Sequence, residues 1–249
     1  AIKGKKLNGN NFVSEAFKKG ASLAIVNKFS DKNSYSKQIK VKNTLNFLTK
    51  CSKIYRKNLL TKIIAITGSC GKTTLKEMLG SSLNKISKTT YSPKSFNNKY
   101  GVPLSILNIK QSDKFGVLEV GMDKKGEIDY LTKIIKPDLG IITNISYAHS
   151  KNFSNIKGIA NAKAEIISNI KPSGTIILNG DDDFFYYHKK IGLNKNLSVL
   201  SFGINNQFLS TKLIKVKKKK NKFHLLIKVG NSNYVFYSNN NNKSNIYNI

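Results

Sequence analysis

The central part of the chain alternates short apolar runs with longer amphipathic runs. The apolar runs are rich in isoleucine, leucine and valine, and they predict strands at 62–66, 115–120, 139–143, 174–178 and 197–202. Near-continuous apolar strands that alternate with helices are typical of a parallel sheet covered by helices on both faces. Ligands of such sheets bind beyond the carboxyl ends of the strands, so polar residues near those ends are the candidates for a functional site.

The pattern is different in the N-terminal part of the chain. Residues 1–60 alternate short apolar runs with polar turns, and they predict a helix after Asn10 and Asn11, a strand at 23–26 and a helix at 44–58. Helices and a strand in so short a stretch indicate a small α/β unit. We expect a domain boundary near residue 60.

Beyond residue 207 the pattern changes again, to short strands of the antiparallel kind. The sequence predicts these strands at 208–209, 223–227 and 234–237. The basic run from Lys215 to Lys220 is interpreted as a solvated hairpin end. The fold expected is therefore α/β. A central domain at 61–249 has a mostly parallel sheet flanked by helices plus a small antiparallel part, and a partial α/β domain at 1–60 precedes it.

The composition adds a strong positive charge. The chain of 249 residues carries 43 Lys and Arg against 13 Asp and Glu, a formal net charge of +30. A nucleic-acid-binding NTPase is one interpretation of that charge. However, nearly all the basic residues are lysines spread along the whole chain, whereas nucleic-acid sites favour arginine and interleaved aromatic residues. We therefore expect a general compositional bias and no specific nucleic acid partner.

Cysteine usage and hydropathy bear on the compartment. The two cysteines, Cys51 and Cys70, lie in unrelated contexts. This argues against a disulfide framework and predicts a cytoplasmic protein. No apolar run approaches the ~20 residues that a membrane-spanning helix needs, so we expect no membrane span.

The segment from Thr67 to Thr74 is the most informative in the chain, because it joins a predicted strand to a predicted helix. Gly68 and Gly71 allow a tight turn that brings backbone N–H groups close to a polyphosphate, and a helix N-terminus adds partial positive charge. Lys72 can reach the β- and γ-phosphates, and the Thr73 hydroxyl can ligate Mg²⁺. The alternative is a glycine-rich turn with a chance Lys-Thr pair. The ordered strand, glycines, lysine, hydroxyl and helix favour a phosphate loop, although Ile66 replaces the first glycine of the usual pattern.

Two candidates come at or just after later strands. Glu119 ends a buried strand, and a buried carboxylate needs a partner, which could be a Mg²⁺ ion beside the triphosphate or one of the many lysines. His149 follows the strand at 139–143 and is either an active-site residue or a surface histidine. Its place near the end of a strand favours the site.

Lys163 falls in the middle of an apolar helical stripe formed by Ile156, Ile159, Ile166, Ile167 and Ile170. A lysine that points into a core either snorkels to the surface or has a lowered pKa. A lowered pKa would make its amine nucleophilic toward CO₂ and yield a carbamate. Asn179 and Asp181 to Asp183 follow the strand at 174–178, where they could cap the next helix or read an adenine edge.

Taken together, these residues resemble the Mur ligases, the ATP-dependent amide ligases of peptidoglycan precursor synthesis. The similar segments are Ile66-Thr-Gly-Ser-Cys-Gly-Lys-Thr-Thr74, Ser95-Phe-Asn-Asn-Lys-Tyr-Gly-Val-Pro-Leu104, Leu118-Glu-Val-Gly121 with Gly126-Glu-Ile128, Asn144 to His149, Ala162-Lys-Ala-Glu-Ile166 and Leu178-Asn-Gly-Asp181. The second of these resembles the branch that adds D-alanyl-D-alanine to UDP-N-acetylmuramoyl-tripeptide. Upstream, residues 4–12 are similar to the family's UDP-sugar domain, with Asn8 in place of the usual aspartate.

The resemblance implies a role for each candidate, with ATP and Mg²⁺ as cofactors. The triphosphate would be held by Gly68, Ser69, Cys70, Gly71, Lys72, Thr73 and Thr74. Metal would be held by Thr73, Glu119, His149 and a carbamylated Lys163, and the catalytic residues would be Lys72, His149 and Lys163. Asn98 would contact phosphate or metal, and Asn179 would lie near the adenine.

The family has a third, C-terminal domain, which the resemblance does not reach. The chain begins with Ala1 and ends in a segment, 243–249, that resembles the start of the helix closing the central domain. We therefore expect a fragment truncated at both ends, monomeric, that binds MgATP without completing ligation. The alternatives left open are a catalytically silent nucleotide-binding fragment, a sister Mur ligase, and a basic P-loop NTPase acting on nucleic acid.

Overall fold

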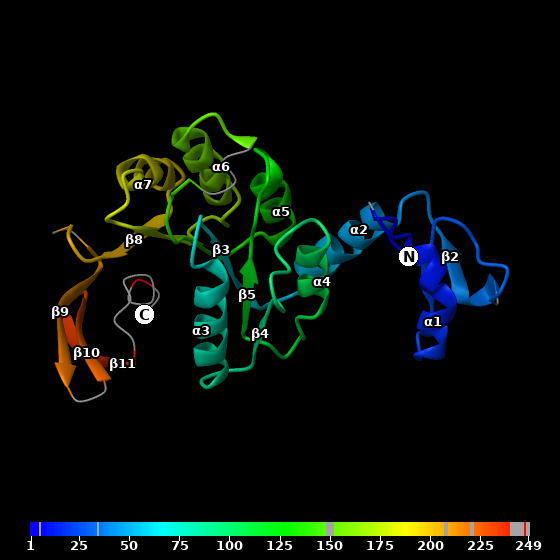
Figure 1. The fold of residues 1–249 in the computed structure, drawn as a ribbon, viewed down its shortest axis with the longest axis horizontal. Coiled ribbons are helices and arrows are strands. Elements are labelled where there is room, and N and C mark those ends of the chain that lie inside the picture. Colours follow the sequence, from blue (N-terminus) through cyan, green and yellow to red (C-terminus); the bar gives the residue numbers. More distant parts are fainter. Residues whose placement is uncertain are drawn as a thin grey trace. The chain divides into compact units, whose positions relative to one another are not determined.

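A computed structural model describes residues 1–4, 6–33, 35–147, 152–206, 209–219, 222–239 and 247. The chain divides into two compact units, Ala1–Asn58 and Leu59–Ile249 (Figure 1). Each unit has its own sheet. The second unit carries the phosphate loop and the residues that follow the predicted strands.

The first unit is built from short elements around one parallel strand pair. These are η1 (Gly9–Phe12), α1 (Val13–Lys18), β1 (Ala24–Val26), η2 (Tyr35–Lys37), β2 (Gln38–Lys40) and α2 (Thr44–Lys57). Side-chain caps start two of them: Asn8 Oδ1 accepts from Asn10 N, and Asn43 Oδ1 accepts from Asn46 N. Such Asn caps satisfy N–H groups that lack a partner within the helix. The expected helix and strand of residues 10–26 are both present.

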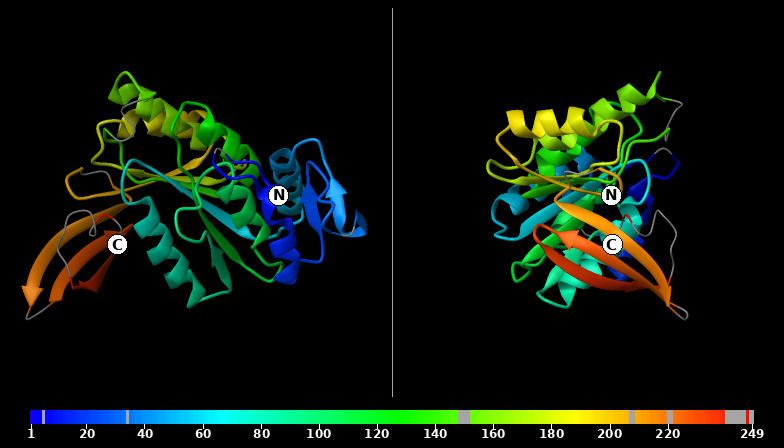
Figure 2. Two further views of the ribbon diagram at one scale, coloured as in Figure 1. Left: turned by 45° about the vertical axis from the view of Figure 1, so that its right-hand side comes forward. Right: turned by 90° about the vertical axis from the view of Figure 1, so that its left-hand side faces the viewer.

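The second unit contains one sheet with the strand order β11-β10-β9-β8-β7-β6-β3-β5-β4. Its strands are β3 (Lys62–Thr67), β4 (Thr89–Tyr91), β5 (Phe115–Glu119), β6 (Leu139–Ile142), β7 (Thr175–Asn179), β8 (Ser198–Gly203), β9 (Thr211–Lys219), β10 (Lys222–Val229) and β11 (Ser232–Ser238). Pairing is parallel from β4 to β9 and antiparallel among β9, β10 and β11. Figure 2 shows the antiparallel strands as the orange and red end of the sheet. The predicted α/β fold is confirmed.

Helices cover both faces of the parallel strands. They are α3 (Lys72–Asn84), α4 (Gly101–Leu107), α5 (Glu127–Ile135), α6 (Ile156–Ser168) and α7 (Phe185–Asn194). Helix α3 packs on β3, β4 and β5, whereas α4, α5, α6 and α7 contact one another in a row (Figure 1). The alternation along β3 divides the core between the faces: Ile64 and Ile66 pack with Leu75 and Leu79 of α3. All parallel strands therefore end at one edge, where β3 turns into the phosphate loop.

Helical spacing in the sequence predicts an apolar stripe on α3 formed by Leu75, Met78, Leu79, Leu83 and Ile86, and the structure bears this out only in part. The buried residues of α3 are Lys76 and Gly80, whereas Met78 is 37% exposed and Ile86 lies beyond the helix and is 80% exposed. The Tyr91 ring packs directly against the helix at Gly80, because a Cβ there would lie 2.5 Å from the ring. Leu75, Leu79 and Leu83 pack against the core as the stripe predicts, whereas Met78 and Ile86 do not.

The antiparallel part also differs from expectation. Most of the basic run lies inside strand β9, where Lys215 pairs with Leu226 and Lys217 with His224, and not only at the hairpin end. Leu209 lies outside any strand. Apolar residues explain the difference, because Leu213 and Val216 interrupt the lysines and pair with Ile227 and Leu225 of β10, on either side of a register shift. In the described part of the chain, no helix is long and apolar enough to cross a membrane.

Helix α7 contains a histidine that ties it to α6. His188 is 2% exposed, and its Nε2 lies 3.1 Å from the Ala160 carbonyl oxygen. Burial lowers the pKa of His188 below its ordinary value of 6.5. In the folded state the ring therefore stays neutral at pH values where the unfolded chain already binds a proton.

This difference predicts a pH-dependent stability. Above about pH 6.5 the His188 ring is neutral in both the folded and the unfolded state. Below that pH the unfolded state binds more protons, so the free energy of unfolding decreases as the pH is lowered, by up to about 1.4 kcal/mol per pH unit. Urea unfolding of wild type and His188→Gln between about pH 7.5 and about pH 5 measures this. We expect a shallower acid loss in His188→Gln, and parallel profiles would contradict the prediction.

Candidate functional site

The phosphate loop connects β3 to α3 through two glycines with positive φ. Gly68 has φ 147°, and a Cβ there would lie 1.9 Å from Thr143 Oγ1. Gly71 has φ 81° and is the N-cap of α3. Only glycine adopts these conformations at low cost, and the first also needs the missing side chain. The sequence thus dictates a tight turn with the N-terminus of α3 at its end.

The loop is fixed to the segment that follows β6. Ser69 N donates to Asn144 O at 2.9 Å, and the Ser69 and Ser146 groups exchange two hydrogen bonds of 2.9 Å. Cys70 N donates to Asn144 Oδ1 at 3.0 Å, and Thr143 Oγ1 donates to Cys70 O at 2.6 Å. These contacts join two adjacent strand ends and hold the loop in one conformation.

Lys72, the first residue of α3, folds back over the loop. Its Nζ donates to Gly68 O at 2.7 Å and to Ser69 O at 3.2 Å. Burial lowers the pKa of Lys72, although the nearby Glu119 carboxylate favours the charged form. The side chain is half-buried, so its charge is available to an anion at the loop.

Glu119 lies at the end of β5 and is 1% exposed. Its Oε2 accepts from Thr73 Oγ1 at 2.8 Å, and its Oε1 accepts from Asn97 Nδ2 at 2.7 Å. A hydroxyl and a carboxylate so close together are the oxygen ligands that Mg²⁺ prefers beside phosphates. The donor set therefore fits a magnesium ion. Within the described ranges, no three His, Cys, Asp or Glu side chains group as a larger metal site would require.

Asn97, rather than Asn98, makes the contact to Glu119, and sequence reasoning missed it. Asn98 Oδ1 accepts from Tyr100 N at 3.0 Å and Gly101 N at 3.1 Å, so this side chain orders the start of α4. A Cβ on Gly121 would lie 2.8 Å from the Asn97 side chain. Both residues are asparagines in the same segment, so the sequence alone does not show which of them contacts Glu119. The three-dimensional structure is needed to distinguish them.

Lys163 lies on the buried face of α6, as the helical stripe predicts, and it is 2% exposed. Burial, and to a smaller extent the charge of Lys72, lowers its pKa from 10.5 to about 7. A large share of the amine is therefore neutral near pH 7. The influence of Lys72 places this amine within electrostatic reach of the phosphate loop.

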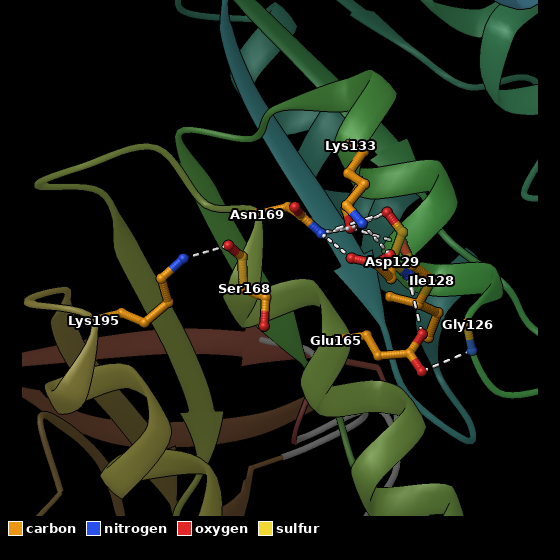
Figure 3. Close-up of polar contacts among 9 residues, drawn as sticks. Gly126, Ile128, Asp129, Lys133, Glu165, Ser168, Asn169 and Lys195 are labelled. Carbon is orange, nitrogen blue, oxygen red and sulfur yellow. Dashed lines mark hydrogen bonds and ion pairs between the residues drawn. The ribbon is translucent and has the colours of Figure 1, made fainter.

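Helix α6 is held against α5 by polar contacts next to Lys163 (Figure 3). Glu165 accepts from Gly126 N at 2.7 Å and Asp129 N at 3.0 Å, which caps the start of α5 from the neighbouring helix. Asn169 Nδ2 donates to Asp129 Oδ1 at 2.9 Å, and Lys133 forms an ion pair with Asp129 at 2.6 Å. Figure 3 also shows Lys195 reaching Ser168 O at the end of α6. These contacts fix the orientation of the helix that carries Lys163.

A cavity of about 350 Å³ opens beside the loop. It is lined by Cys70, Gly71, Leu75, Thr143, Asn144, Ile145, Asn179, Asp181, Asp182, Asp183, Phe202 and Tyr247. Asn179 Nδ2 donates to Thr143 O at 3.2 Å, and its Oδ1 accepts from Asp181 N at 3.0 Å. Asp181 also accepts from Ile204 N at 2.6 Å and from the Tyr247 hydroxyl at 2.7 Å. These bonds lower the pKa of Asp181 although its burial opposes them.

The structure thus brings most candidates to one edge of the sheet. Hydrogen bonds join Thr73 to Glu119, electrostatics couple Lys72 with Lys163, and the cavity joins Asn179 to the loop. Thr74 is exposed on the first turn of α3. His149 lies outside the described residues.

Comparison with known proteins identifies the family of this chain. Residues 66–249 match the family model described as Mur ligase middle domain. The chain is 39% identical over 207 residues to UDP-N-acetylmuramoyl-tripeptide–D-alanyl-D-alanine ligase of Buchnera aphidicola subsp. Acyrthosiphon pisum, covering 83% of this chain and 45% of that protein. It is 35% identical over 234 residues to the ligase of the same name from Rickettsia prowazekii, covering 93% and 51%.

Solved structures lead to the same family. A crystal structure of MurF from Acinetobacter baumannii superposes with a TM-score of 0.87 at 30% identity, covering 100% of this chain and 53% of that one. MurF ligase from Thermotoga maritima in complex with ADP gives 0.85 at 28% identity, covering 100% and 56%. This chain therefore spans about half the length of these relatives, and by family match, sequence identity and fold it belongs to the Mur ligases.

Proposed function

We propose that this chain is the ATP-binding part, with a portion of the substrate domain, of the ligase that joins D-alanyl-D-alanine to UDP-N-acetylmuramoyl-tripeptide. The observation that carries the proposal is the group formed by Lys72, the Thr73–Glu119 pair and the buried Lys163 at one edge of the sheet. The relatives named above support the substrates, because their names state this reaction. The first unit, with residues 4–12, would contribute to the UDP-sugar side.

ATP would place its triphosphate on the loop from Gly68 to Thr74 and its base in the adjacent cavity, near Asn179. Backbone N–H groups at the start of α3 point toward that position, and the helix N-terminus favours negative charge. The ADP complex of the Thermotoga maritima relative supports a nucleotide in this fold.

Thr73 and Glu119 would hold a magnesium ion, and His149 and a carbamylated Lys163 are proposed to help hold a second. A bound magnesium ion neutralises phosphate charge and lowers the barrier to phosphoryl transfer. Because the Thr73 hydroxyl donates its hydrogen to Glu119, its lone pairs stay available to a magnesium ion. Asn97 would keep the Glu119 carboxylate oriented throughout, because it donates to the other oxygen.

The proposed reaction has two steps. A carboxylate oxygen of the peptide substrate attacks the γ-phosphorus of ATP, the bond to the β-phosphate oxygen breaks, and ADP leaves. The amine of D-alanyl-D-alanine then attacks the resulting acyl phosphate, phosphate leaves, and the nitrogen loses a proton as the amide forms. Lys72 would stabilise the charge on the transferred phosphoryl group, which is the main contribution a protein makes to such transfers.

ATP and nucleotide-linked precursors are cytoplasmic metabolites, so we place this protein in the cytoplasm and propose that it acts as a monomer. Both cysteines are free, which agrees with a reducing compartment.

Substitution of Lys72 tests the proposed nucleotide site. Lys72→Ala is expected to weaken MgATP binding by roughly 10- to 100-fold, since a hydrogen bond to a charged group contributes about 1.5–3 kcal/mol. Titration calorimetry on the 249-residue chain measures this. The matched control is Lys85→Ala, which removes an exposed lysine at the other end of α3 and should leave the affinity unchanged.

Equal affinity of wild type and Lys72→Ala would rule out the assignment of the loop. DNA binding that weakens steeply with salt, together with no response to UDP-N-acetylmuramoyl-tripeptide, would favour the nucleic-acid NTPase instead.

Lys163 is expected to form a carbamate. Its neutral amine would attack CO₂, forming a nitrogen–carbon bond with loss of a proton, and a pKa of about 7 leaves much of the amine neutral at pH 8. NMR of the chain in isotope-labelled bicarbonate should show a carbamate carbon that disappears in Lys163→Met and persists in Lys133→Met. A signal retained in Lys163→Met would contradict the assignment.

A further inference from the structure

Lys76 is buried in α3 and takes no part in the proposed chemistry, yet it lies one turn from Thr73. We propose that Lys76 is a positioning residue for the magnesium site, because it fixes the segment of residues 92–98 that orients Glu119. This inference rests on the proposed function, since Glu119 is taken as a magnesium ligand.

The side chain of Lys76 is 0% exposed, and all three hydrogens of its ammonium group have an acceptor nearby. Nζ donates to Ser92 O at 2.7 Å and to Lys94 O at 2.5 Å, and it lies 2.7 Å from Glu77 Oε1. A fully buried lysine is rare and needs such complete pairing to be tolerated. Two of its acceptors are backbone carbonyls of one irregular segment, so the side chain acts as a tie between α3 and that segment.

Ser92 connects this tie to the backbone of Glu119. Ser92 is 0% exposed, and its Oγ accepts from Glu119 N at 3.2 Å while its carbonyl accepts from Lys76. Ser92 N in turn donates to Val117 O at 2.9 Å. Movement of Ser92 would therefore disturb the end of β5, whose last residue is Glu119.

A second connection runs through Lys94 to the carboxylate itself. Lys94 has φ 46°, a conformation that residues other than glycine rarely adopt, and its carbonyl is held by Lys76. Three residues later, Asn97 donates to Glu119 Oε1 and its carbonyl accepts from Gly121 N at 2.8 Å. Lys76 therefore stabilises the turn that positions Asn97 against Glu119.

Helix α3 also contacts Glu119 directly, through Thr73, in addition to the two connections through Ser92 and Lys94. Thr73 and Lys76 are three residues apart on α3, so their side chains lie on one face. Thr73 contacts Glu119 Oε2, whereas Lys76 controls the backbone N–H and the Oε1 side through the 92–98 segment. Helix α3 thereby sets the orientation of the carboxylate from several directions, and groups that orient a metal ligand in this way affect metal affinity.

The test separates magnesium binding from nucleotide binding. Lys76→Met keeps the apolar stem and removes the donors. We expect the magnesium concentration that half-saturates ATP binding to rise roughly 10- to 100-fold, the range seen when groups behind a metal ligand are removed. ATP affinity measured with a chelator should change by less than about twofold, because the loop from Gly68 to Lys72 is untouched. Calorimetry with and without Mg²⁺ on the full chain gives both values.

Three further variants test this interpretation. Lys171→Met removes another lysine that pairs with a carboxylate, Asp138 at 3.0 Å, and should leave the magnesium dependence unchanged. If Lys76→Met does not fold, Lys76→Gln, which retains one donor group, is measured instead and should show a smaller shift in the same direction. Asn97→Ala combined with the Lys76 variant should lose less than the product of the single losses, since both act on Glu119.

Unchanged magnesium dependence in Lys76→Met would overturn the inference, as would an equal loss of ATP affinity with and without Mg²⁺, which indicates a general structural role. Fully multiplying losses in the double variant would also contradict it. Failure of wild type to bind MgATP, or binding that does not depend on Lys72, would instead refute the proposed function.

Discussion

A carboxylate that is removed from water needs hydrogen-bond donors, and Glu119 obtains them from separate segments of the chain. Thr73 comes from α3 and Asn97 from the loop after β4, while the backbone N–H of Glu119 is bound by Ser92. An unpaired buried carboxylate is costly, so this end of β5 is stable only when α3 and the 92–98 segment are both in place. The contacts that stabilise this part of the second unit are therefore the same contacts that set the geometry of the site.

Three lysines near this edge differ in what surrounds them. Lys76 is buried and fully paired, so it can position neighbouring groups but cannot itself bind an anion. Lys72 is partly buried and bonded only to loop carbonyls, so an anion can compete for it. Burial leaves Lys163 with a pKa of about 7, where the amine can act as a nucleophile. In a chain with 43 basic residues, burial and partners, not charge, distinguish these three lysines from the rest.

The phosphate loop shows why local sequence was informative here. Gly68 and Gly71 need conformations that other residues avoid, and the order of strand, glycines, lysine and helix is a property of neighbouring residues. Lys163 could likewise be placed on a buried helix face, because helical spacing depends on positions three and four apart. Such features follow from short-range geometry, which is why the α/β order and the loop could be predicted before the structure was known.

Contacts between distant segments were not predictable in that way. Nothing in the sequence distinguishes Asn97 from Asn98, and periodicity placed Met78 rather than Lys76 on the buried face of α3. The choice is made by the register of β5 against β3 and by the close approach of Gly80 to Tyr91. By itself the sequence determined the α/β order of the central part and the tight glycine turn between β3 and α3. Only the tertiary structure decided which polar side chains meet Glu119, because that depends on how segments far apart along the chain pack together.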